Sequence, residues 1–516
     1  MHGYGAEDIR AAESGPLAAG VPLMRRAAHA LARTTAEILR ERHRPRGSVL
    51  VLAGGGNNGG DGLHAAADLV LRGIPTTVLL TRQNVHPGGL DRARRAGARI
   101  FSLTEDEPHP PWHEAAGRAT VWIDALAGLG VRGGLRGVPA QVVNELSELR
   151  RDQVVIAVDA PSGIGADSGA LAGPVLAADV TVTFGQAKAG LLLPPAALHV
   201  GRLEVVDLGL QEQFTGRTPQ VRRLQTADLA AAWPVPEQTG HKYTRGVLGI
   251  LAGSPQYPGA GILTTGAARA TGCGMVRYLG PREVAEKVIT TYPDVVPARG
   301  RVQALVVGPG IGGAEELDRL PGAIEAVLEE SRAEPPRLVW DAGALSLLPA
   351  HDHLSRTYPS VLTPHAGELA SLLQAYGSDA TRSDVEADPA RWADLAAQHT
   401  GACVLLKGPV TLVACPDGAR YSQADGSPWM ATAGSGDVLA GILGALAATS
   451  GHDLGLLAAA AAAVHGRAGR RAGGGGPITA PDITAATPAV ITDLLTRGSA
   501  AAIDQEQGRE PGTLEP

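Results

Sequence analysis

The stretch "LVLAGGGNNGGDGLHAAADL", Leu50–Leu69, runs from an apolar segment through a glycine-rich turn into a helical pattern. Glycine lets the backbone approach a ligand closely and adopt positive φ. A helix that starts near Asp61 would turn free N–H groups and its dipole toward this turn, which is an arrangement that binds phosphates. The stretch is neither GxGxxG nor GxxxxGK[ST], and Asp61 could equally be a simple N-cap.

Outward from this stretch, short apolar segments alternate with segments of helical length. Continuous apolar strands separated by helices predict a parallel sheet that is covered on both faces. The strands expected in the first half are Ser48–Ala53, Thr76–Leu80, Ala119–Asp124, Val154–Asp159, Asp179–Phe184 and Leu203–Leu208.

A polar, proline-containing segment, 211–223, interrupts this pattern, and we place a domain boundary there. The second half then repeats the same alternation, with strands running into loops at 246–254, 304–310, 337–343, 360–368 and 403–409. We therefore expect two α/β domains, residues 1–212 and 226–498. The polar, acidic residues 499–516 are expected to form a disordered tail.

The composition agrees with a two-domain chain and limits the classes of partner that it is expected to bind. The 516 residues exceed the ~250–300 at which a single core stops growing. The net charge of −7 and the lack of basic clusters argue against nucleic-acid binding. The start of the chain lacks a signal-peptide pattern, and the apolar run 456–464 is too short to cross a bilayer. We expect small-molecule partners, no membrane or nucleic-acid partner, and a homo-oligomer.

The three cysteines, Cys273, Cys403 and Cys415, lie far apart in the sequence and form no CxxC spacing. This pattern argues against a disulfide framework or a zinc site and favours a reducing compartment. We therefore expect a cytoplasmic protein.

The segment Asn57–Asp61 as a unit resembles the NAD(P)H-hydrate epimerase family, whose domain is the Rossmann-like "YjeF N-terminal" domain. Three further stretches match that family in order: "AAGVPLMRRAAHALA" at 18–32, "WIDALAGLGVRGG" at 122–134 and "VVIAVDAPSGIGADSG" at 154–169. The resemblance covers about residues 1–212. It implies a Rossmann-like three-layer fold and a substrate that is NADHX or NADPHX, the nicotinamide cofactor hydrated at ring carbon 6.

The resemblance also implies the site residues of this domain. The residues expected to bind substrate are Asn57, Asn58, Gly59, Gly60, Asp61, Gly128, Leu129, Gly130, Val131, Arg132, Gly133, Gly134 and Asp159. A potassium ion is expected at Asn58, Asp124 and Ser162, whose hard oxygens suit a hard cation.

Epimerisation requires positioned acids and bases, for which Asp159 is the first candidate and Asp124 the second. Each acid could instead only cap a loop at a strand end. Arg132 stands where some relatives carry a lysine; if that lysine transfers a proton, arginine cannot replace it, because its high pKa keeps it charged.

A second glycine-rich loop, "ATAGSGDVLAGILGALAA" at 431–448, runs into an almost wholly apolar helix that must be buried. Its N-terminus would attract an anion. The carboxylate of Asp437 beside a phosphate is unfavourable unless it serves as a base in phosphoryl transfer. From this stretch alone, Asp437 could also be an N-cap.

This loop resembles the ribokinase-like fold and, more narrowly, the ADP-dependent NAD(P)H-hydrate dehydratase family. The other matching stretches are 241–263, 306–312, 362–373 and 405–411, so the resemblance covers about 226–495. It implies phosphorylation of the C6 hydroxyl by ADP, with Mg²⁺ bridging the phosphates, followed by elimination of phosphate. Asp437 would be the catalytic base, and the amides around Gly434–Gly436 would stabilise charge on the transferred group.

The dehydratase family also implies two sets of binding residues. Substrate is expected at Ala260, Gly312, His365 and Asp437. The adenine nucleotide is expected at Lys407, Gly408, Pro409, Val410, Thr411 and Gly436. His365 could be merely a neighbour of a helix N-cap. The sequence departs from the family pattern at Ala433, Ser435 and Gly343, and Ala433 would restrict the loop if positive φ is required there.

The order epimerase then dehydratase is coherent, because the hydrate forms as an R and S mixture and the dehydratase accepts only S. Two alternatives remain open. One is a ribokinase-like kinase of a small molecule with an appended nucleotide-binding domain. The other is an N-terminal domain that acts only as a binding module.

Overall fold

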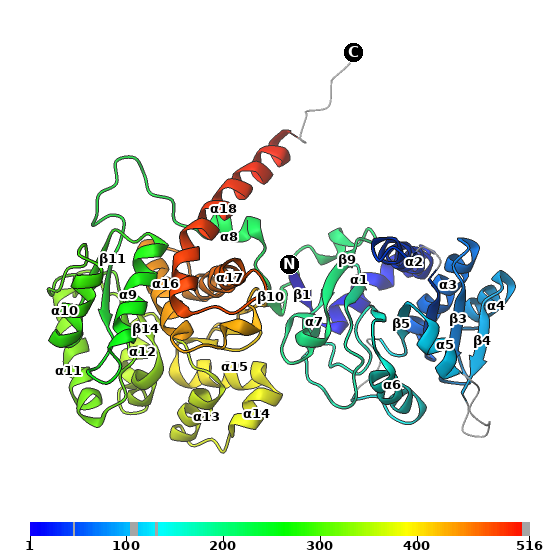
Figure 1. Cartoon of the computed structure of the whole chain (residues 1–516), viewed down its shortest axis with the longest axis horizontal. Helices are drawn as coiled ribbons and strands as arrows, with labels where there is room; N and C mark the ends of the chain where they lie inside the picture. The colour runs from blue at the N-terminus through cyan, green and yellow to red at the C-terminus, as the bar shows by residue number, and fades with distance from the viewer. Residues whose placement is uncertain (45–46, 104–111, 129–132, 508–516) are drawn as a thin grey trace, which may run out of the picture. The chain divides into compact units, whose positions relative to one another are not determined.

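The computed structural model describes residues 1–44, 47–103, 112–128 and 133–507, and beyond Arg497 it describes the backbone alone. The chain divides into two compact units, Met1–Arg222 and Arg223–Pro516, each of which carries its own sheet and helices (Figure 1). The division lies inside the segment 211–223 that the sequence marks as a boundary. That segment is not irregular throughout: β10, Val221–Arg222, pairs antiparallel with β1, His2–Tyr4.

Unit 1 is built on a seven-stranded, all-parallel sheet in the order β4-β3-β2-β5-β6-β7-β9. Its strands are β2 Val49–Ala53, β3 Thr76–Leu80, β4 Arg99–Ser102, β5 Val121–Ala125, β6 Val154–Val158, β7 Val180–Phe184 and β9 Arg202–Val206. This order reverses beside β2, where a doubly wound sheet forms its ligand crevice. The glycine-rich loop that follows β2 therefore lies at the expected binding edge.

Helices cover both faces of this sheet, which gives the three-layer arrangement predicted. Val49 and Val51 of β2 face one apolar layer, while Leu50 and Leu52 face the other, because successive strand side chains alternate. The first layer is covered by α2 Leu23–Glu41, α3 Asn57–Leu71 and α4 Pro87–Ala96, and the second by α5 Trp112–Arg118 and α6 Val138–Leu149. The unit also contains helix α1 Ala6–Ala18 and the short elements β8 Ala187–Lys188 and α7 Ala189–Leu192.

Unit 2 contains eight strands in the order β12-β11-β13-β14-β15-β16-β17-β18. The pairs from β12 to β16 are parallel, and β17 and β18 are added antiparallel. The strands are β11 Val247–Leu251, β12 Met275–Tyr278, β13 Ala304–Val307, β14 Arg337–Trp340, β15 Ser360–Leu362, β16 Cys403–Leu406, β17 Thr411–Ala414 and β18 Arg420–Gln423.

Apolar helices cover one face of this second sheet. Two glycines let α16, Ser435–Thr449, approach its neighbours closely. A Cβ at Gly441 would lie 2.3 Å from the Thr264 carbonyl oxygen, and a Cβ at Gly444 would lie 2.3 Å from the Val306 side chain. The helices in this core are α8 Thr226–Ala232, α9 Pro258–Thr271, α16, α17 Leu454–Gly473 and α18 Ala480–Gln507. The remaining helices are α10 Arg282–Thr291, α11 Ala314–Glu330, α12 Asp352–Thr357, α13 Ala366–Ala375, α14 Arg382–Ala387 and α15 Pro389–Thr400.

The predicted architecture is confirmed, because each unit is an α/β domain built on a mainly parallel sheet. The sequence did not indicate β4, β12, β17 or β18, which are short and lie toward the sheet edges. Helix α18 reaches Gln507, so residues 499–507 are helical where a disordered tail was expected; their alanines and glutamines favour helix. Residues 508–516 lie outside the described part of the chain.

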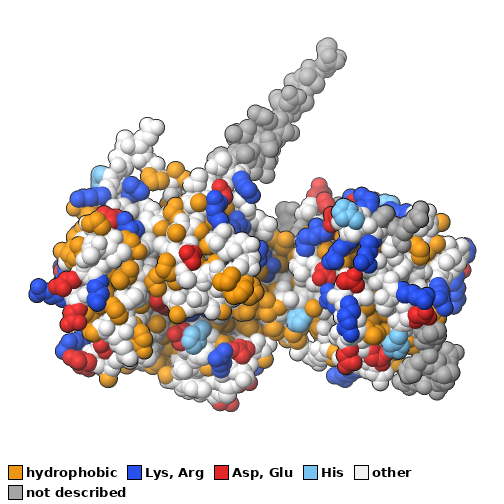
Figure 2. Space-filling view, in the orientation of Figure 1, with side chains coloured by type: hydrophobic (Ala, Val, Ile, Leu, Met, Phe, Trp, Pro, Cys, Tyr) orange, Lys and Arg blue, Asp and Glu red, His pale blue; other side chains and the backbone are white. Residues whose placement is uncertain are grey.

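On the face shown in Figure 2, basic and acidic side chains are interspersed. Within the described residues, no helix combines the length and apolar character needed to span a membrane.

Candidate active sites

The glycine-rich loop of unit 1 leads directly into helix α3. This helix begins at Asn57 with Gly56 as its N-cap, so Asp61 is the fifth helical residue and the N-cap alternative for it is wrong. The helix starts early because Gly59 packs onto the Gly54 carbonyl, where an added Cβ would lie only 2.1 Å from the oxygen. The result is a helix N-terminus held tightly against the end of β2.

A cavity of about 1170 Å³ opens beside this helix start. Six of the predicted substrate-binding residues line it: Asn57, Asn58, Asp61, Gly128, Gly134 and Asp159. Gly59 and Gly60 do not, because Gly59 packs on Gly54 and Gly60 on Met24 and His86. Gly133 has a positive φ of 80° but is not among the lining residues. Leu129, Gly130, Val131 and Arg132 lie outside the described residues.

The three residues predicted to hold potassium come together at the ends of β5, β6 and the start of α3. The fully buried Asp124 accepts hydrogen bonds from the Ser162 hydroxyl at 2.6 Å and the Ser162 amide at 2.8 Å. Asn58 Nδ2 donates to the Ala127 carbonyl at 2.9 Å, while its Oδ1 is buried and has no partner among the described residues. Burial raises the pKa of Asp124, against the Ser162 hydrogen bonds that lower it.

Asp159 follows β6 in an unusual backbone conformation, with φ at 66°. Its Oδ1 accepts hydrogen bonds from Thr183 Oγ1 at 3.2 Å and from the ammonium of Lys188, which is only 1% exposed. Lys188 Nζ also donates to Thr183 Oγ1 at 3.0 Å and to the Phe184 carbonyl at 3.2 Å. A buried lysine thus fixes a strained aspartate at the wall of the cavity.

Two more acids face the Asp159–Lys188 pair. Burial raises the pKa of Asp61 well above its usual value, and the charges of Asp159 and Glu13 raise it further while Lys188 opposes them. Burial likewise raises the pKa of Glu13, which reaches the cavity from α1. Carboxyls such as Asp61 and Glu13, whose pKa is raised by burial in a cavity, are typical of acid–base catalysis.

In unit 2 the loops after β11, β13 and β14 converge at the carboxyl edge of the sheet. A Cβ at Gly310 would lie 2.5 Å from that of Ala260, which is the third residue of α9. A Cβ at Gly343 would lie 1.9 Å from the Ile311 carbonyl oxygen and 3.5 Å from Gly312 Cα. The predicted substrate residues Ala260 and Gly312 therefore lie on one edge, and no side chain fits at position 343.

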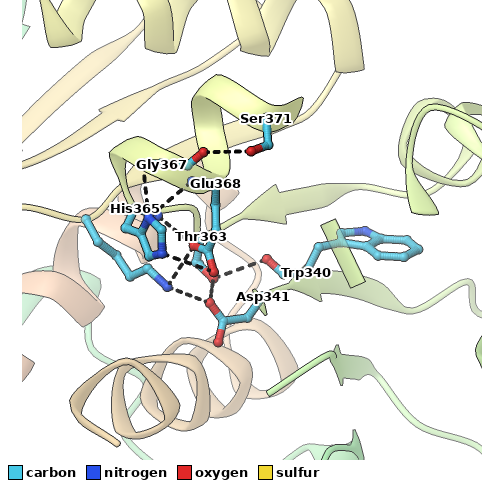
Figure 3. Close-up of polar contacts among 8 residues, drawn as sticks. Trp340, Asp341, Thr363, His365, Gly367, Glu368 and Ser371 are labelled. Atoms are coloured by element: carbon cyan, nitrogen blue, oxygen red, sulfur yellow. Dashed lines mark hydrogen bonds and ion pairs between the residues drawn. The ribbon is translucent and has the colours of Figure 1, made fainter. Parts of the chain in front are cut away.

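The next loops bring Lys407 to Asp341 and Glu368, the two acids labelled in Figure 3. Lys407 Nζ lies 2.9 Å from Asp341 Oδ1 and 3.5 Å from Glu368 Oε2. Thr363 Oγ1 donates to the same Asp341 oxygen at 2.7 Å. Burial lowers the pKa of Lys407, but Asp341 and Glu368 together raise it above its usual value, so this side chain stays an ammonium.

His365 is itself the N-cap of helix α13. Its Nδ1 accepts from the amides of Gly367 at 3.0 Å and Glu368 at 3.1 Å, as Figure 3 shows. The Glu368 carboxylate in turn accepts a hydrogen bond from the His365 amide at 2.8 Å. Because Nδ1 accepts, the ring proton is on Nε2, which can still donate toward a ligand. The capping role is therefore present and leaves a substrate role open.

Asp437 is the third residue of α16, whose N-cap is Gly434 with φ at 84°. Among the described residues, no hydrogen bond or ion pair to the Asp437 carboxylate is found, so the N-cap alternative is wrong for it as well. Burial and the charge of Asp341 raise the pKa of Asp437 to about 7, while Lys407 lowers it. A base with a pKa near neutrality suits proton transfer at physiological pH.

The predicted nucleotide residues lie next to this cluster. Lys407 directly follows β16 and Thr411 begins β17, so the segment between them is the turn of a hairpin. A Cβ at Gly436 would lie 3.6 Å from Lys407 Nζ, which places the helix start of α16 against that turn. Gly408 and Pro409 are exposed and Val410 is buried, so the open part of the turn can contact a ligand.

Sequence reasoning missed several residues of both sites. Lys188, Glu13, Asp341 and Glu368 carry charge into the two sites, and His465 lies 3.2 Å from the Ser435 hydroxyl. Asp341 and Glu368 stand in stretches already singled out, "DAGAL" and "TPHAGE", so their position after predicted strands was a usable signal. Lys188 follows a strand by only four residues, and nothing in its neighbourhood marks it as buried.

The two units thus define a tandem α/β enzyme, with a helix N-terminus and buried acids at the carboxyl edge of each sheet. Residues 21–190 match the family described as YjeF-related protein N-terminus, and residues 248–482 match the family described as NAD(P)H-hydrate dehydratase.

Two curated relatives match nearly the whole chain. The "Bifunctional NAD(P)H-hydrate repair enzyme Nnr" of Mycobacterium tuberculosis is 41% identical over 87% of this chain and 89% of its own length. The protein of the same description from Moorella thermoacetica is 35% identical over 82% of this chain and 83% of its own length. The chain therefore belongs to the family of bifunctional NAD(P)H-hydrate repair enzymes, and the prediction of that family is confirmed.

Among solved structures, the chain is similar to an ADP/ATP-dependent NAD(P)H-hydrate dehydratase from Bacillus subtilis that was co-crystallised with ATP/Mg²⁺. That similarity covers 53% of this chain and 99% of the other, with 23% identity and a TM-score of 0.46.

Proposed function

We propose that unit 1 interconverts the R and S epimers of NADHX and NADPHX, and that unit 2 dehydrates the S epimer at the expense of ADP. The observation that carries the proposal is the group formed by Asp437, Asp341 and Lys407 beside a helix N-terminus. This group supplies a base, a fixed cation and anion-binding amides at one place, which phosphoryl transfer requires.

In unit 2, Asp437 accepts the proton of the C6 hydroxyl as that oxygen attacks the terminal phosphoryl group of ADP. The amides of Gly434 and Gly436 stabilise the charge on the transferred group from the start of α16, whereas the Ser435 amide already donates to the Thr432 carbonyl at 3.3 Å. Lys407, Gly436 and the turn 408–411 hold the nucleotide. Departure of phosphate from C6 and loss of a proton from C5 then restore the double bond of the dihydronicotinamide ring.

The residues present fit a magnesium ion bound mainly through the nucleotide. Mg²⁺ is usually held by one or two carboxylates together with substrate phosphates and water. Glu368 and Asp341 offer carboxylate oxygens beside Lys407. Within the described residues, no three His, Cys, Asp or Glu side chains gather as a metal cage, which agrees with an ion that arrives with ADP. When bound, it neutralises phosphate charge.

In unit 1, Asp159 is the residue that moves a proton during epimerisation, and Lys188 positions it. Asp61 and Glu13 face the same pair, and their raised pKa values suit a protonated partner to Asp159. Asp159 and the protonated acid would act as base and acid on the ring and on its C6 oxygen. Backbone of the loop 54–57 and the start of α3 would receive the pyrophosphate.

A potassium ion fits the group formed by Asn58, Asp124 and Ser162. The unpartnered buried Oδ1 of Asn58 needs a positive neighbour, and Asp124 is a fully buried carboxylate. Together with Ser162 Oγ and the Ala127 carbonyl they form an all-oxygen donor set, which is what a hard cation prefers. When bound, the ion would offset the Asp124 charge and supply no proton.

A cytoplasmic location and a homo-oligomer also stay predictions.

Racemic NADHX tests this assignment on the full-length protein. With ADP, the wild type should convert all of it to NADH, Asp159→Asn should stop after the S half, and Asp437→Asn should yield none. Accumulation of a stable phosphate ester would instead favour a small-molecule kinase. Complete conversion by Asp159→Asn would show that unit 1 does not use that acid and would leave a binding module as the better description.

A further inference from the structure

Two of the three cysteines meet across a pair of strands, although they are distant in the sequence. Strands β16 and β17 are antiparallel, with Val404 opposite Ala414. Continuing this register by one residue places Cys403 opposite Cys415, with both side chains on the same face. Their sulfurs lie 2.6 Å apart, and both residues are free thiols. The spacing of the cysteines in the sequence did not indicate this contact.

The surroundings of the two sulfurs differ. Cys415 is buried, while Cys403 is only half-buried and is the thiol more open to a small oxidant. Helix α17 crosses over them at Gly455, where a Cβ would lie 2.4 Å from the Cys415 sulfur and 3.8 Å from that of Cys403. A glycine here leaves space for two sulfurs and for little else.

We propose that Cys403 and Cys415 are a modification site, at which a mild two-electron oxidant such as hydrogen peroxide forms a cross-strand disulfide. The Cys403 thiol reacts first with peroxide, giving a sulfenic acid and one water. The Cys415 thiol then attacks that sulfur and displaces a second water, so two thiols and one peroxide become one disulfide and two waters. A thiol reductant of the dithiol class reverses the reaction.

The order of the two steps follows from the two environments. The hydrogen bond with Cys403 and burial raise the pKa of Cys415, so Cys415 is a poor first nucleophile toward an oxidant. Once Cys403 is oxidised, Cys415 already lies beside it, because the two sulfurs are 2.6 Å apart on directly opposed strand residues. Closure therefore competes well with further oxidation of Cys403.

Cys273 provides an internal control. Burial raises the pKa of its thiol to about 12, and its sulfur contacts the carbonyls of Ala268 at 3.6 Å and Met275 at 3.8 Å. No other cysteine among the described residues lies beside it. The proposal therefore assigns the oxidation to one pair and predicts that the third thiol survives.

Tryptic mapping of the oxidised full-length protein tests this directly. Trypsin cleaves after Arg391, Lys407 and Arg420, which puts Cys403 in peptide 392–407 and Cys415 in peptide 408–420. We expect hydrogen peroxide to reduce the titratable thiols of the denatured protein from three to one, and a single new species that links these two peptides. Dithiothreitol should restore three thiols.

Matched variants exclude other sources of thiol loss. Cys273→Ser should lose both of its remaining thiols to the same linked species, whereas Cys415→Ser should form no intramolecular link. The proposal is overturned if three thiols persist, if peptide 270–277 appears in the link, or if Cys403 in the wild type is converted to sulfinic or sulfonic acid without a link. Mapping of the wild type needs no variant, so a destabilised mutant cannot obscure the result.

Discussion

Lys407 and Asp341, joined at 2.9 Å, act on Asp437 in opposite directions. The Asp341 carboxylate raises the pKa of Asp437, whereas the Lys407 ammonium lowers it. Burial and these two opposing charges hold the pKa of the candidate base near 7. Each charge can be removed by a single substitution.

The first prediction concerns the pH dependence of dehydration. Asp437 must be deprotonated to act as a base, so kcat/KM for (S)-NADHX should rise with pH and reach half its maximum near 7. Asp341→Asn should move this midpoint to lower pH, and Lys407→Met should move it to higher pH. The measurement is a pH profile at saturating ADP for each variant. Glu386→Gln, which removes an exposed charge paired with Arg382, is the control and should leave the midpoint unchanged.

The second prediction concerns Asp437 itself. Asp437→Asn keeps the shape of the side chain and removes the base, so turnover should fall by about 10²–10⁴-fold while ADP binding persists. Single-turnover kinetics and an ADP titration check the two halves of this statement. Turnover within a few-fold of wild type would mean that another group takes the proton.

The third prediction concerns the loop before α16. Gly434 has φ at 84°, and a Cβ there would lie 2.4 Å from Leu263 Cδ1. Gly434→Ala should therefore cost about 1–3 kcal/mol from backbone strain alone and should lower both the melting temperature and dehydration. Ala433→Gly is the matched control, since Ala433 has no positive φ, and it should leave dehydration unchanged. A larger effect of Ala433→Gly than of Gly434→Ala would show that the strained position is not Gly434.

The fourth prediction concerns Lys188. Lys188→Met leaves Asp159 without its buried cation and should abolish most R-to-S conversion, while ADP-dependent dehydration of the S epimer is unaffected. Lys188→Arg keeps the charge and should restore part of the conversion. The pH profile of epimerisation should change in the Met variant, which a purely structural role would not cause. Equal loss in both variants, with unchanged pH profiles, would contradict a positioning role.

The fifth prediction concerns the monovalent cation. Epimerisation by protein prepared without sodium or potassium should rise as potassium is added, and Asp124→Asn should require more potassium or lose the response. Dehydration of the S epimer by the same preparations is the control and should not follow this titration. Full epimerase activity without any monovalent cation would rule the ion out.

The sequence was sufficient for the architecture and for most positions at the sheet edges. Continuous apolar strands identified the parallel sheets, and the glycine-rich stretches located Asn57–Asp61 and Asp437. These predictions succeed because strand burial and loop glycines are local properties of the chain. The extra strands β17 and β18 could not be expected, because the antiparallel addition depends on which edge is left free.

The charged partners of the predicted acids could not be found from the sequence in the same way. Lys188 reaches Asp159 across 29 positions and Lys407 reaches Asp341 across 66, so no local spacing relates either pair. The sequence showed that positions 433 and 343 depart from the family pattern, but it could not show the structural effect of either residue. Positive φ is at Gly434 rather than Ala433, and a neighbouring carbonyl rather than chemistry excludes a side chain at 343.

The contact between Gly59 and the carbonyl of Gly54 has a consequence for binding thermodynamics. Because this contact holds the start of α3 against β2, the turn proposed to receive a pyrophosphate does not have to be ordered on binding. Because little chain entropy is lost on binding, less of the favourable free energy of the new hydrogen bonds is offset. The epimerase cavity should accordingly recognise the shape common to both epimers, and any discrimination between them must arise at the ring, near Asp159.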